Sequence, residues 1–103
     1  MPTLVIHREH LLEFVEARAL AFDWAAQAQS DWGMQTSFIL GNNLEGVPDT
    51  VEFHRAGVRG SLKVDAKEFV LRAELGFLLG SFKEQIEAQI IQNLDKRLAH
   101  ARP

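Results

Sequence analysis

The sequence contains no cysteine, so disulfides, thiolate zinc sites and cysteine nucleophiles are excluded. It also contains no apolar run close to the ~20 residues that a helix needs to span a bilayer. Residues 1–7 lack the basic and apolar regions of a secretory signal. These absences predict a cytoplasmic protein without a membrane span.

Basic residues are in short supply as well. The chain has 11 Lys and Arg against 14 Asp and Glu, and its formal net charge is −3. A nucleic-acid binder would concentrate Lys and Arg on one surface, whereas here both signs are mixed along the chain, so we expect no nucleic-acid partner. The 47 % hydrophobic content is typical of a globular protein, and 103 residues suffice for one domain, 1–103, with a modest core.

The most regular pattern runs from Leu75 to Leu98. Ser81 and Glu84 have the spacing of a capping box, in which the serine side chain accepts from the Glu84 backbone N–H. Apolar residues then recur at helical spacing: Phe82, Ile86, Ile90, Ile91, Leu94 and Leu98. Lys96, Arg97 and Arg102 collect where a helix dipole favours positive charge. We expect a long amphipathic helix that packs on a sheet or on another helix.

The N-terminal third predicts a strand and a second long helix. Thr3 to His7 alternates as a short strand does, and it is isolated enough to lie at a sheet edge. A helix over about residues 10–31 follows, and Gly33 is its expected C′ residue. The apolar side of the helical wheel contains Leu11, Phe14, Val15, Phe22, Ala25 and Trp32. Leu20 and Trp24 fall on or near the opposite, polar side, where two neighbouring apolar side chains indicate a partner surface.

The middle of the chain predicts the sheet. Met34 to Leu40 is a second strand, residues 41–49 form a loop, and Thr50 to Leu75 forms a three-stranded meander with turns at Ala56-Gly57 and Ala66-Lys67. One register pairs apolar or small residues across all three strands: Val51–Leu62, Phe53–Gly60, Val64–Phe69, Leu62–Leu71 and Gly60–Ala73. The opposite face is polar and carries Glu52, His54, Arg59, Ser61, Lys63, Arg72 and Glu74. One face of the sheet is therefore apolar and one is solvated.

The element order β-α-β-β-β-β-α predicts a two-layer α+β domain. Both long helices must cover the single apolar face of a curved antiparallel sheet, like a small helix-grip fold. The row Phe53–Gly60–Ala73 has little side chain, so either a helix approaches closely there, which is the commoner cause, or a hollow remains. Polar residues on the apolar helical arcs either reach the rim or line such a pocket. The candidate lining is Arg18, Gln29, Phe53, Gly60, Ala73 and Asn93.

Catalytic and metal chemistry have little support in the sequence. His7 and His10 are close in sequence, but a zinc site needs three or four ligands, and polar residues at a strand end are the ordinary interpretation. No serine has the context of a nucleophile elbow. Residues 76–80 lack the lysine and the glycine density of a phosphate loop. We expect no catalytic residue, cofactor or metal, and a protein that is not an enzyme.

The chain resembles the small bacterial family of polyhydroxyalkanoic acid system proteins over nearly its whole length. The stretches that carry the resemblance are Val5-Ile6-His7-Arg8-Glu9-His10, Ala17-Arg18, Trp24-Ala25, Trp32-Gly33-Met34, Val51-Glu52-Phe53, Arg55-Ala56-Gly57-Val58-Arg59-Gly60-Ser61-Leu62, and Leu75-Gly76-Phe77-Leu78-Leu79 through Phe82, Ile86-Glu87, Ile90 and Asn93-Leu94-Asp95. The closing segment is the most specific of these. The resemblance implies a protein encoded with, or bound to, intracellular polyester storage granules, and it implies no catalytic residues.

Two functions follow from these patterns. In the first, the protein is a non-enzymatic granule-associated or regulatory protein whose partners are the granule surface, a granule protein or a second copy of itself. Its interaction surface would be apolar and would contain Leu20, Trp24, Phe77, Leu78 and Leu79. In the second, it is a small carrier that binds an acyl or lipid-like ligand between the sheet and the C-terminal helix.

Overall fold

The computed structural model describes residues 2–42 and 45–101. Its elements are β1 (Thr3–Glu9), α1 (Phe14–Trp32), β2 (Gln35–Ile39), β3 (Asp49–Arg55), β4 (Val58–Val64), β5 (Glu68–Leu75), α2 (Phe77–Gly80) and α3 (Lys83–Ala101). The predicted order is confirmed, with the short helix α2 added before the last long helix. Arg102, residues 43–44 of the predicted loop and the side chain of His100 lie outside the described residues.

The five strands form one antiparallel sheet in the order β1-β5-β4-β3-β2, so β1 lies at an edge as predicted. The predicted register is confirmed at every pair, including Phe53 opposite Gly60, Gly60 opposite Ala73 and Arg59 opposite Glu74. Gly57, in the first turn, has a φ of 86°, a backbone conformation that favours glycine. Alternating side chains and local turns therefore set the register.

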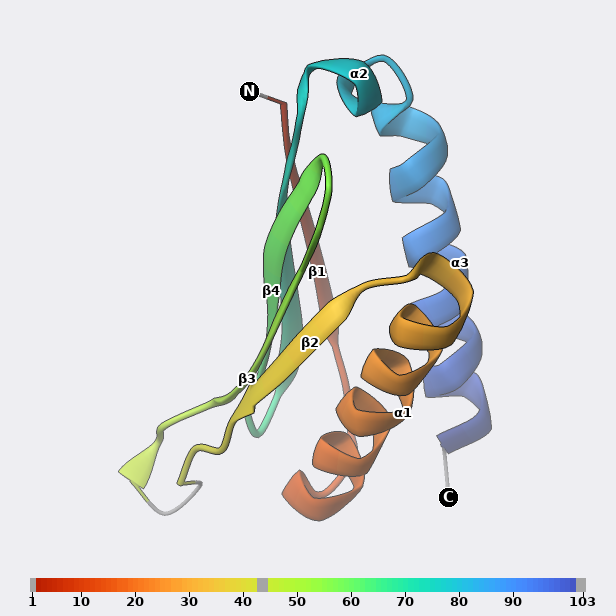
Figure 1. Cartoon of the computed structure of the whole chain (residues 1–103). Coiled ribbons are helices and arrows are strands. Elements are labelled where there is room, and N and C mark those ends of the chain that lie inside the picture. The colour runs from red at the N-terminus through yellow and green to blue at the C-terminus, as the bar shows by residue number, and fades with distance from the viewer. Residues whose placement is uncertain (1, 43–44, 102–103) are drawn as a thin grey trace.

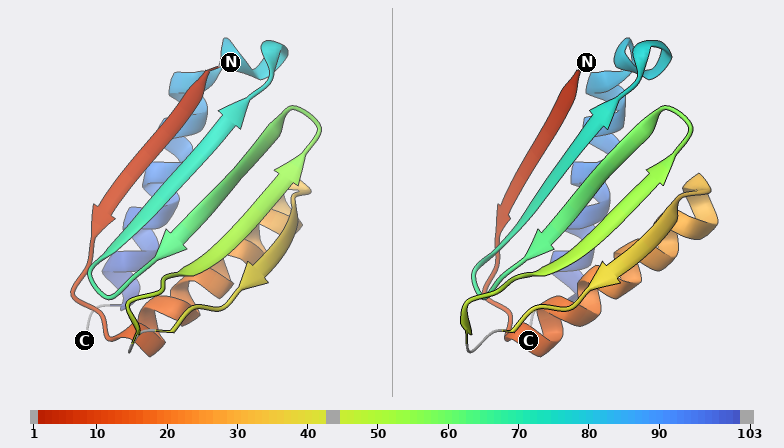
Figure 2. Two further views of the ribbon diagram at one scale, coloured as in Figure 1. Left: turned by 90° about the vertical axis from the view of Figure 1, so that its left-hand side faces the viewer. Right: turned by 60° about the vertical axis from the view of Figure 1, so that its left-hand side comes forward.

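Both long helices lie on the same face of the sheet (Figures 1 and 2). α3 runs behind the β1 and β5 half, and α1 runs behind the β3 and β2 half. The other face carries the polar residues and faces outward. This is the predicted two-layer α+β architecture, and the arrangement does not establish a closer likeness to a helix-grip fold.

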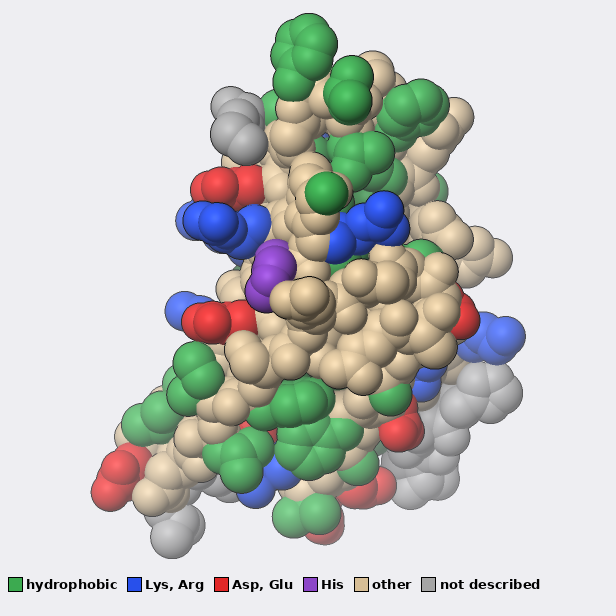
Figure 3. Space-filling model, in the orientation of Figure 1, with side chains coloured by type: hydrophobic (Ala, Val, Ile, Leu, Met, Phe, Trp, Pro, Cys, Tyr) green, Lys and Arg blue, Asp and Glu red, His purple; other side chains and the backbone are tan. Residues whose placement is uncertain are grey.

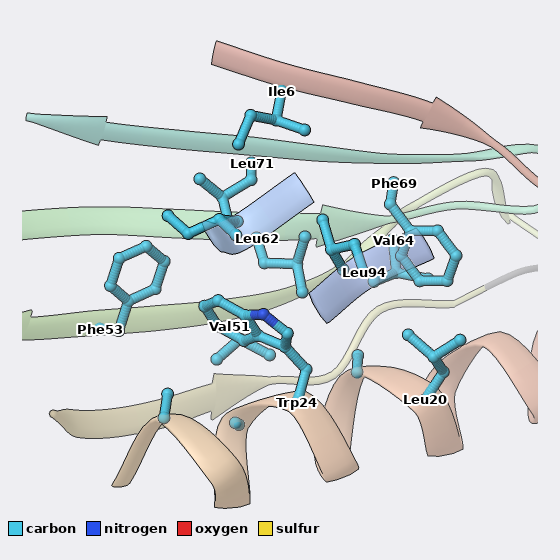
Figure 4. Packing of buried hydrophobic residues seen from close by; sticks show 14 of the residues in the cluster. Ile6, Leu20, Trp24, Val51, Phe53, Leu62, Val64, Phe69, Leu71 and Leu94 are labelled. Atoms are coloured by element: carbon cyan, nitrogen blue, oxygen red, sulfur yellow. The ribbon is translucent and has the colours of Figure 1, made fainter. Parts of the chain in front are cut away.

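The core lies between these layers and is filled by alternate residues of the strands (Figure 4). Trp24 of α1 projects onto the sheet, with its ring 5.3 Å from the ring of Phe53. α3 contributes Ile90 and Leu94. The largest fully buried side chains are Trp24, Phe69, Leu4, Leu62, Leu71, Leu75, Leu94, Val51 and Val64.

The predicted apolar side of α1 is confirmed for Ala25 and Trp32 but is wrong for its large members Leu11, Val15 and Phe22. The side that faces the sheet contains Ala17, Leu20, Ala21, Trp24, Ala25 and Ala28. Two members of the predicted side, Leu11 and Val15, are 98 % and 75 % exposed. The small alanines let the helix backbone approach the sheet, and Trp24 fills the space that remains, so shape decided the orientation more than the number of large side chains.

The predicted capping box at Ser81 and Glu84 is also wrong. Ser81 is the C-cap of α2, its backbone is helical at φ −71° and ψ −13°, and its hydroxyl donates to the Leu78 carbonyl at 3.2 Å. An N-cap residue needs an extended backbone, which Ser81 cannot have while it ends α2. The α1 helix has the related contact instead, because the Glu13 N–H donates to Glu16 Oε1 at 3.3 Å.

The strand glycine at position 60 is explained by contacts within the sheet itself, where its Cβ position lies 2.3 Å from the Arg72 carbonyl oxygen. A Cβ on Gly60 would lie 2.7 Å from Phe53 Cζ and 2.9 Å from Ala73 Cα. The Phe53 ring therefore covers Gly60, and this contact replaces the expected close approach of a helix. Aromatic rings that cover strand glycines are a known way to fill such a gap.

Candidate functional site

Three large apolar side chains are exposed at one end of the molecule, and we call Phe77, Leu78 and Phe82 the apolar tip. Phe77 and Leu78 are 93 % and 79 % exposed, and Phe82 is half exposed. They belong to α2 and to the residue before α3, at the top of the molecule in Figures 1 and 3. Exposed apolar groups gathered in one place mark interaction surfaces more often than single exposed residues do.

Backbone contacts hold the tip against the sheet. The Gly76 N–H donates to the Gly57 carbonyl at 2.8 Å, which fixes the start of α2 beside the β3–β4 turn. On the other side, a Cβ on Gly80 would lie 2.7 Å from Pro2 Cγ, so the end of α2 packs closely on the N-terminal segment. Phe77 and Leu78 are therefore displayed by a short helix that is held at both ends.

A groove of about 220 Å³ lies beneath the tip, between the apolar face of the sheet and the first turns of α3. Phe53 and Ala73 line it from the sheet, and Ile86 and Ile90 line it from α3. Leu79 closes it beside the tip, where its Cδ1 lies 3.1 Å from the Cβ position of Gly57. Trp24, Trp32 and Met34 complete the far wall.

The groove has few polar groups. Arg55 and Gln89 are exposed residues in its lining, and Arg55 Nη1 donates to the Trp32 carbonyl at 2.6 Å. The buried indole Nε1 of Trp24 has no hydrogen-bond partner. An apolar channel with a cationic rim can accept an acyl chain and its polar head, whereas nothing in it resembles a catalytic pair.

The remaining predicted lining residues lie elsewhere. Gln29 is exposed and donates to Thr36 Oγ1. Asn93 lines a second groove of about 600 Å³ between α1 and α3, with Glu16, Asp23, Lys96 and Arg97 among its other residues. Gly60 lies under the Phe53 ring. The predicted set of six therefore does not converge on one pocket.

Arg18, also predicted for the pocket, binds Asp49 instead. Nε and Nη2 of Arg18 donate to the two carboxylate oxygens at 2.7 and 2.9 Å, and the Gly41 N–H donates to the same carboxylate at 2.7 Å. The hydrogen bond that Arg18 donates to Asp49 raises the pKa of Arg18, which stays charged. The sequence placed Asp49 in the predicted loop 41–49. The one feature that could have indicated its role as a partner of Arg18 was its position directly before a predicted strand.

The structure buries two of the residues predicted for the interaction surface. Leu20 and Trp24 are 5 % and 2 % exposed and pack in the core, so they cannot form an external contact while the domain is folded. Leu79 is partly buried and faces the groove. Phe77 and Leu78 are therefore the members of that set that are displayed to solvent.

The histidines near the N-terminus have structural partners. His10 is buried, its Nδ1 accepts from the Leu12 N–H at 3.1 Å, and its Nε2 lies 2.9 Å from the Asp65 carbonyl oxygen. His7 contacts the Glu68 carboxylate. Within residues 2–42 and 45–101, no three His, Asp or Glu side chains are grouped as a metal site would require.

The comparisons with known proteins identify one family. A family model described as "Putative polyhydroxyalkanoic acid system protein" matches residues 4–98. No curated protein and no solved structure matches the chain. Among the described residues, no helix combines the length and the apolar character needed to cross a membrane. Because the family model covers β1 to α3, the chain belongs to the polyhydroxyalkanoic acid system protein family.

Proposed function

We propose that this protein associates with polyester storage granules, or regulates polyester metabolism, through the apolar tip, and that it does so without catalysis. The proposal is supported by the family membership and by one structural observation, the exposure of Phe77 and Leu78 on a helix that is held at both ends. Its place of action would be the cytoplasm, at the granule surface.

The tip is suited to an apolar surface on energetic grounds. Burying a Phe or Leu side chain contributes roughly 1.5–3 kcal/mol, so inserting Phe77 and Leu78 together contributes several kcal/mol of binding energy. Phe82 enlarges the same surface, and Lys83 is the next residue beside it. Because the tip is held by backbone contacts, binding needs little further ordering of the chain.

The test is co-sedimentation of purified protein with isolated granules, with an extract from a polymer-free strain as the blank. The double variant Phe77→Ser and Leu78→Ser should lose most of the sedimented protein. Val5→Ser is the matched control, because Val5 is an exposed apolar residue of β1 that does not belong to the tip. Both variants should keep the thermal midpoint of the wild type. A double variant that sediments like the wild type would falsify the role of the tip.

The groove favours a second candidate, a carrier for an acyl or lipid-like ligand. Its volume of about 220 Å³ would hold about seven water-sized groups, because a water occupies ~30 Å³ in the liquid. A medium-length acyl chain fits this size, with its carboxylate near Arg55. Granule association and ligand carriage are separate proposals, because the tip and the groove use different side chains.

Both tryptophans of the chain line the groove, so intrinsic fluorescence can test for a ligand. Octanoate should change the fluorescence of the wild type in a saturable way. Ala73→Leu, which places a larger side chain in the groove, should abolish the change, and Ala26→Leu, on the exposed side of α1, should preserve it. Absence of a saturable response in the wild type would exclude the carrier for this ligand class.

A further inference from the structure

A second exposed apolar surface runs along the side of the molecule, far in sequence from the tip. We call it the flank, and it consists of Leu11, Val15 and Phe22 beside or on α1 with Phe38, Ile39 and Leu40 on or after β2. Figure 3 shows apolar side chains gathered over α1 and β2 in the lower part of the molecule, separated from the tip by a polar band.

A ring contact joins the α1 half of the flank to its β2 half. The rings of Phe22 and Phe38 meet edge to face, with centroids 4.7 Å apart and an interplanar angle of 86°. Gln29 donates to Thr36, about two turns of α1 further along. The side of α1 that carries Phe22 and Gln29 therefore contacts the face of β2 that carries Thr36 and Phe38. In the described residues, no further element covers this surface.

The strand in this surface is an open sheet edge. β2 pairs with β3 and is the last strand of the sheet. An edge strand presents a row of backbone N–H and C=O groups that can pair with a further strand, and edges are normally protected by charged residues or proline. Gln35–Ile39 contains neither. The edge of β2 therefore lacks these two protections.

The opposite edge of the same sheet provides the contrast. β1 carries His7, Arg8 and Glu9 in its second half. Arg8 Nε donates to Asp95 Oδ1 at 2.9 Å, and His7 contacts Glu68. Charged groups with partners of their own protect β1 from pairing, so the two edges of the sheet differ in the property that controls edge-to-edge association.

We infer that the flank is the interface of a two-fold homodimer in which β2 pairs antiparallel with β2 of a second copy. A strand edge requires a strand as partner, and an antiparallel pair about a two-fold axis is complementary to itself. The occupant is a second copy because the uncharged segment Gln35–Ile39 meets itself without repulsion between like charges. Arg18, on the same helix as Val15 and Phe22, is paired with Asp49.

We place the two-fold axis at Phe38, so that Phe38 of one copy lies opposite Phe38 of the other. In this register the Phe22–Phe38 ring pairs of both copies meet at the centre of the interface. Ser37 of one copy then faces Ile39 of the other, and Leu40 faces Thr36. The outer sides of the two α1 helices lie next to each other across the axis. The axis is perpendicular to the joined sheet, so the apolar tips of the two copies point in opposite directions.

The dimer is tested in solution without granules. A negative result for dimerisation can therefore be distinguished from a negative result for granule binding. Native mass measurement should give twice the chain mass of 11.6 kDa. Ile39→Lys places a charge on the pairing edge and should give a folded monomer, whereas Val5→Lys on β1 should remain dimeric. A wild type of 11.6 kDa at tens of micromolar, or an Ile39→Lys variant that remains dimeric, overturns the inference.

The absence of native cysteine allows the register to be read by single-cysteine oxidation. Phe38→Cys should form an intermolecular disulfide, because directly opposed residues of an antiparallel pair come within disulfide range. Val5→Cys, on the opposite edge, should not. Equal cross-linking of the two variants contradicts the interface, and faster cross-linking of Ser37→Cys than of Phe38→Cys contradicts the axis at Phe38.

Discussion

Arg18 and Asp49 form a two-point ion pair that joins the second turn of α1 to the first residue of β3. Arg18 Nε and Asp49 Oδ2 are 2.7 Å apart, and the Asp49 side chain is almost completely buried. Since the Gly41 N–H donates to the same carboxylate, one side chain connects the helix, the end of the β2 strand region and the start of the meander. A planar guanidinium suits this geometry better than an ammonium group.

This pair predicts a specific acid sensitivity. Burial by itself raises the pKa of Asp49, but the hydrogen bond from Arg18, that from the Gly41 N–H and the guanidinium charge outweigh it and lower the pKa. The ionised carboxylate therefore stabilises the fold above the unfolded pKa of about 3.9, and this stabilisation is lost as the pH falls through the lower folded value.

We expect Asp49→Asn to lower the free energy of unfolding by roughly 2–3 kcal/mol at pH 7, because it leaves the guanidinium without its carboxylate. The difference from the wild type should shrink as the pH falls below about 4. Urea denaturation of both proteins between pH 7 and pH 2.5 measures it. A difference that stays constant over that range would show that Asp49 is not ionised in the folded protein.

Substitutions on the buried and the exposed side of α1 should change the free energy of unfolding by very different amounts. Trp24→Ser removes the largest buried side chain and should cost about 3–5 kcal/mol or prevent folding. Val15→Ser, on the exposed side, should change the free energy of monomer unfolding by less than about 0.5 kcal/mol. Urea denaturation at low protein concentration compares them. Similar losses for both would mean that α1 is rotated relative to the arrangement described above.

Gly60→Ala should be destabilising by about 1–3 kcal/mol, because the added Cβ would lie 2.3 Å from the Arg72 carbonyl oxygen. Gly33→Ala is the matched control. It has φ +65° with open space around the Cβ position, and should cost about 1 kcal/mol through backbone strain alone. Thermal denaturation distinguishes the two mechanisms. Combining Gly60→Ala with Phe53→Leu should recover only part of the loss, since the carbonyl contact persists.

Ser81→Ala separates the sequence-based prediction from the structure. Loss of an N-cap would cost ~1 kcal/mol, which is what the capping pattern predicts. In the structure Ser81 is exposed and its hydroxyl donates to Leu78 across one turn, so we expect a change within about 0.5 kcal/mol. A full loss in global unfolding would restore Ser81 as the cap of α3.

Part of the candidate site followed from the sequence. Phe77 and Leu78 form an apolar run between two glycines, and the sequence predicted both for the interaction surface, where the structure exposes them. Leu20 and Trp24 were misplaced because a helical wheel ranks large apolar residues and gives little weight to alanine. The groove lies at Phe53 and Ala73, between the sheet and the C-terminal helix, where the sequence offered a hollow as one of two alternatives. Its walls from Trp24 and Leu79 could not be predicted, because these residues meet only in the folded chain.

The sequence by itself determined the strand order within the meander, its register and the family. These depend on period-two alternation and on turns such as Gly57, whose information lies within a few residues of the chain. Only the tertiary structure decided which side of α1 faces the sheet, that Arg18 meets Asp49, and that Leu79 lies against Gly57 below the tip. Each of these depends on how closely two surfaces can approach, and that distance is set by the volumes of side chains that meet only after the chain has folded.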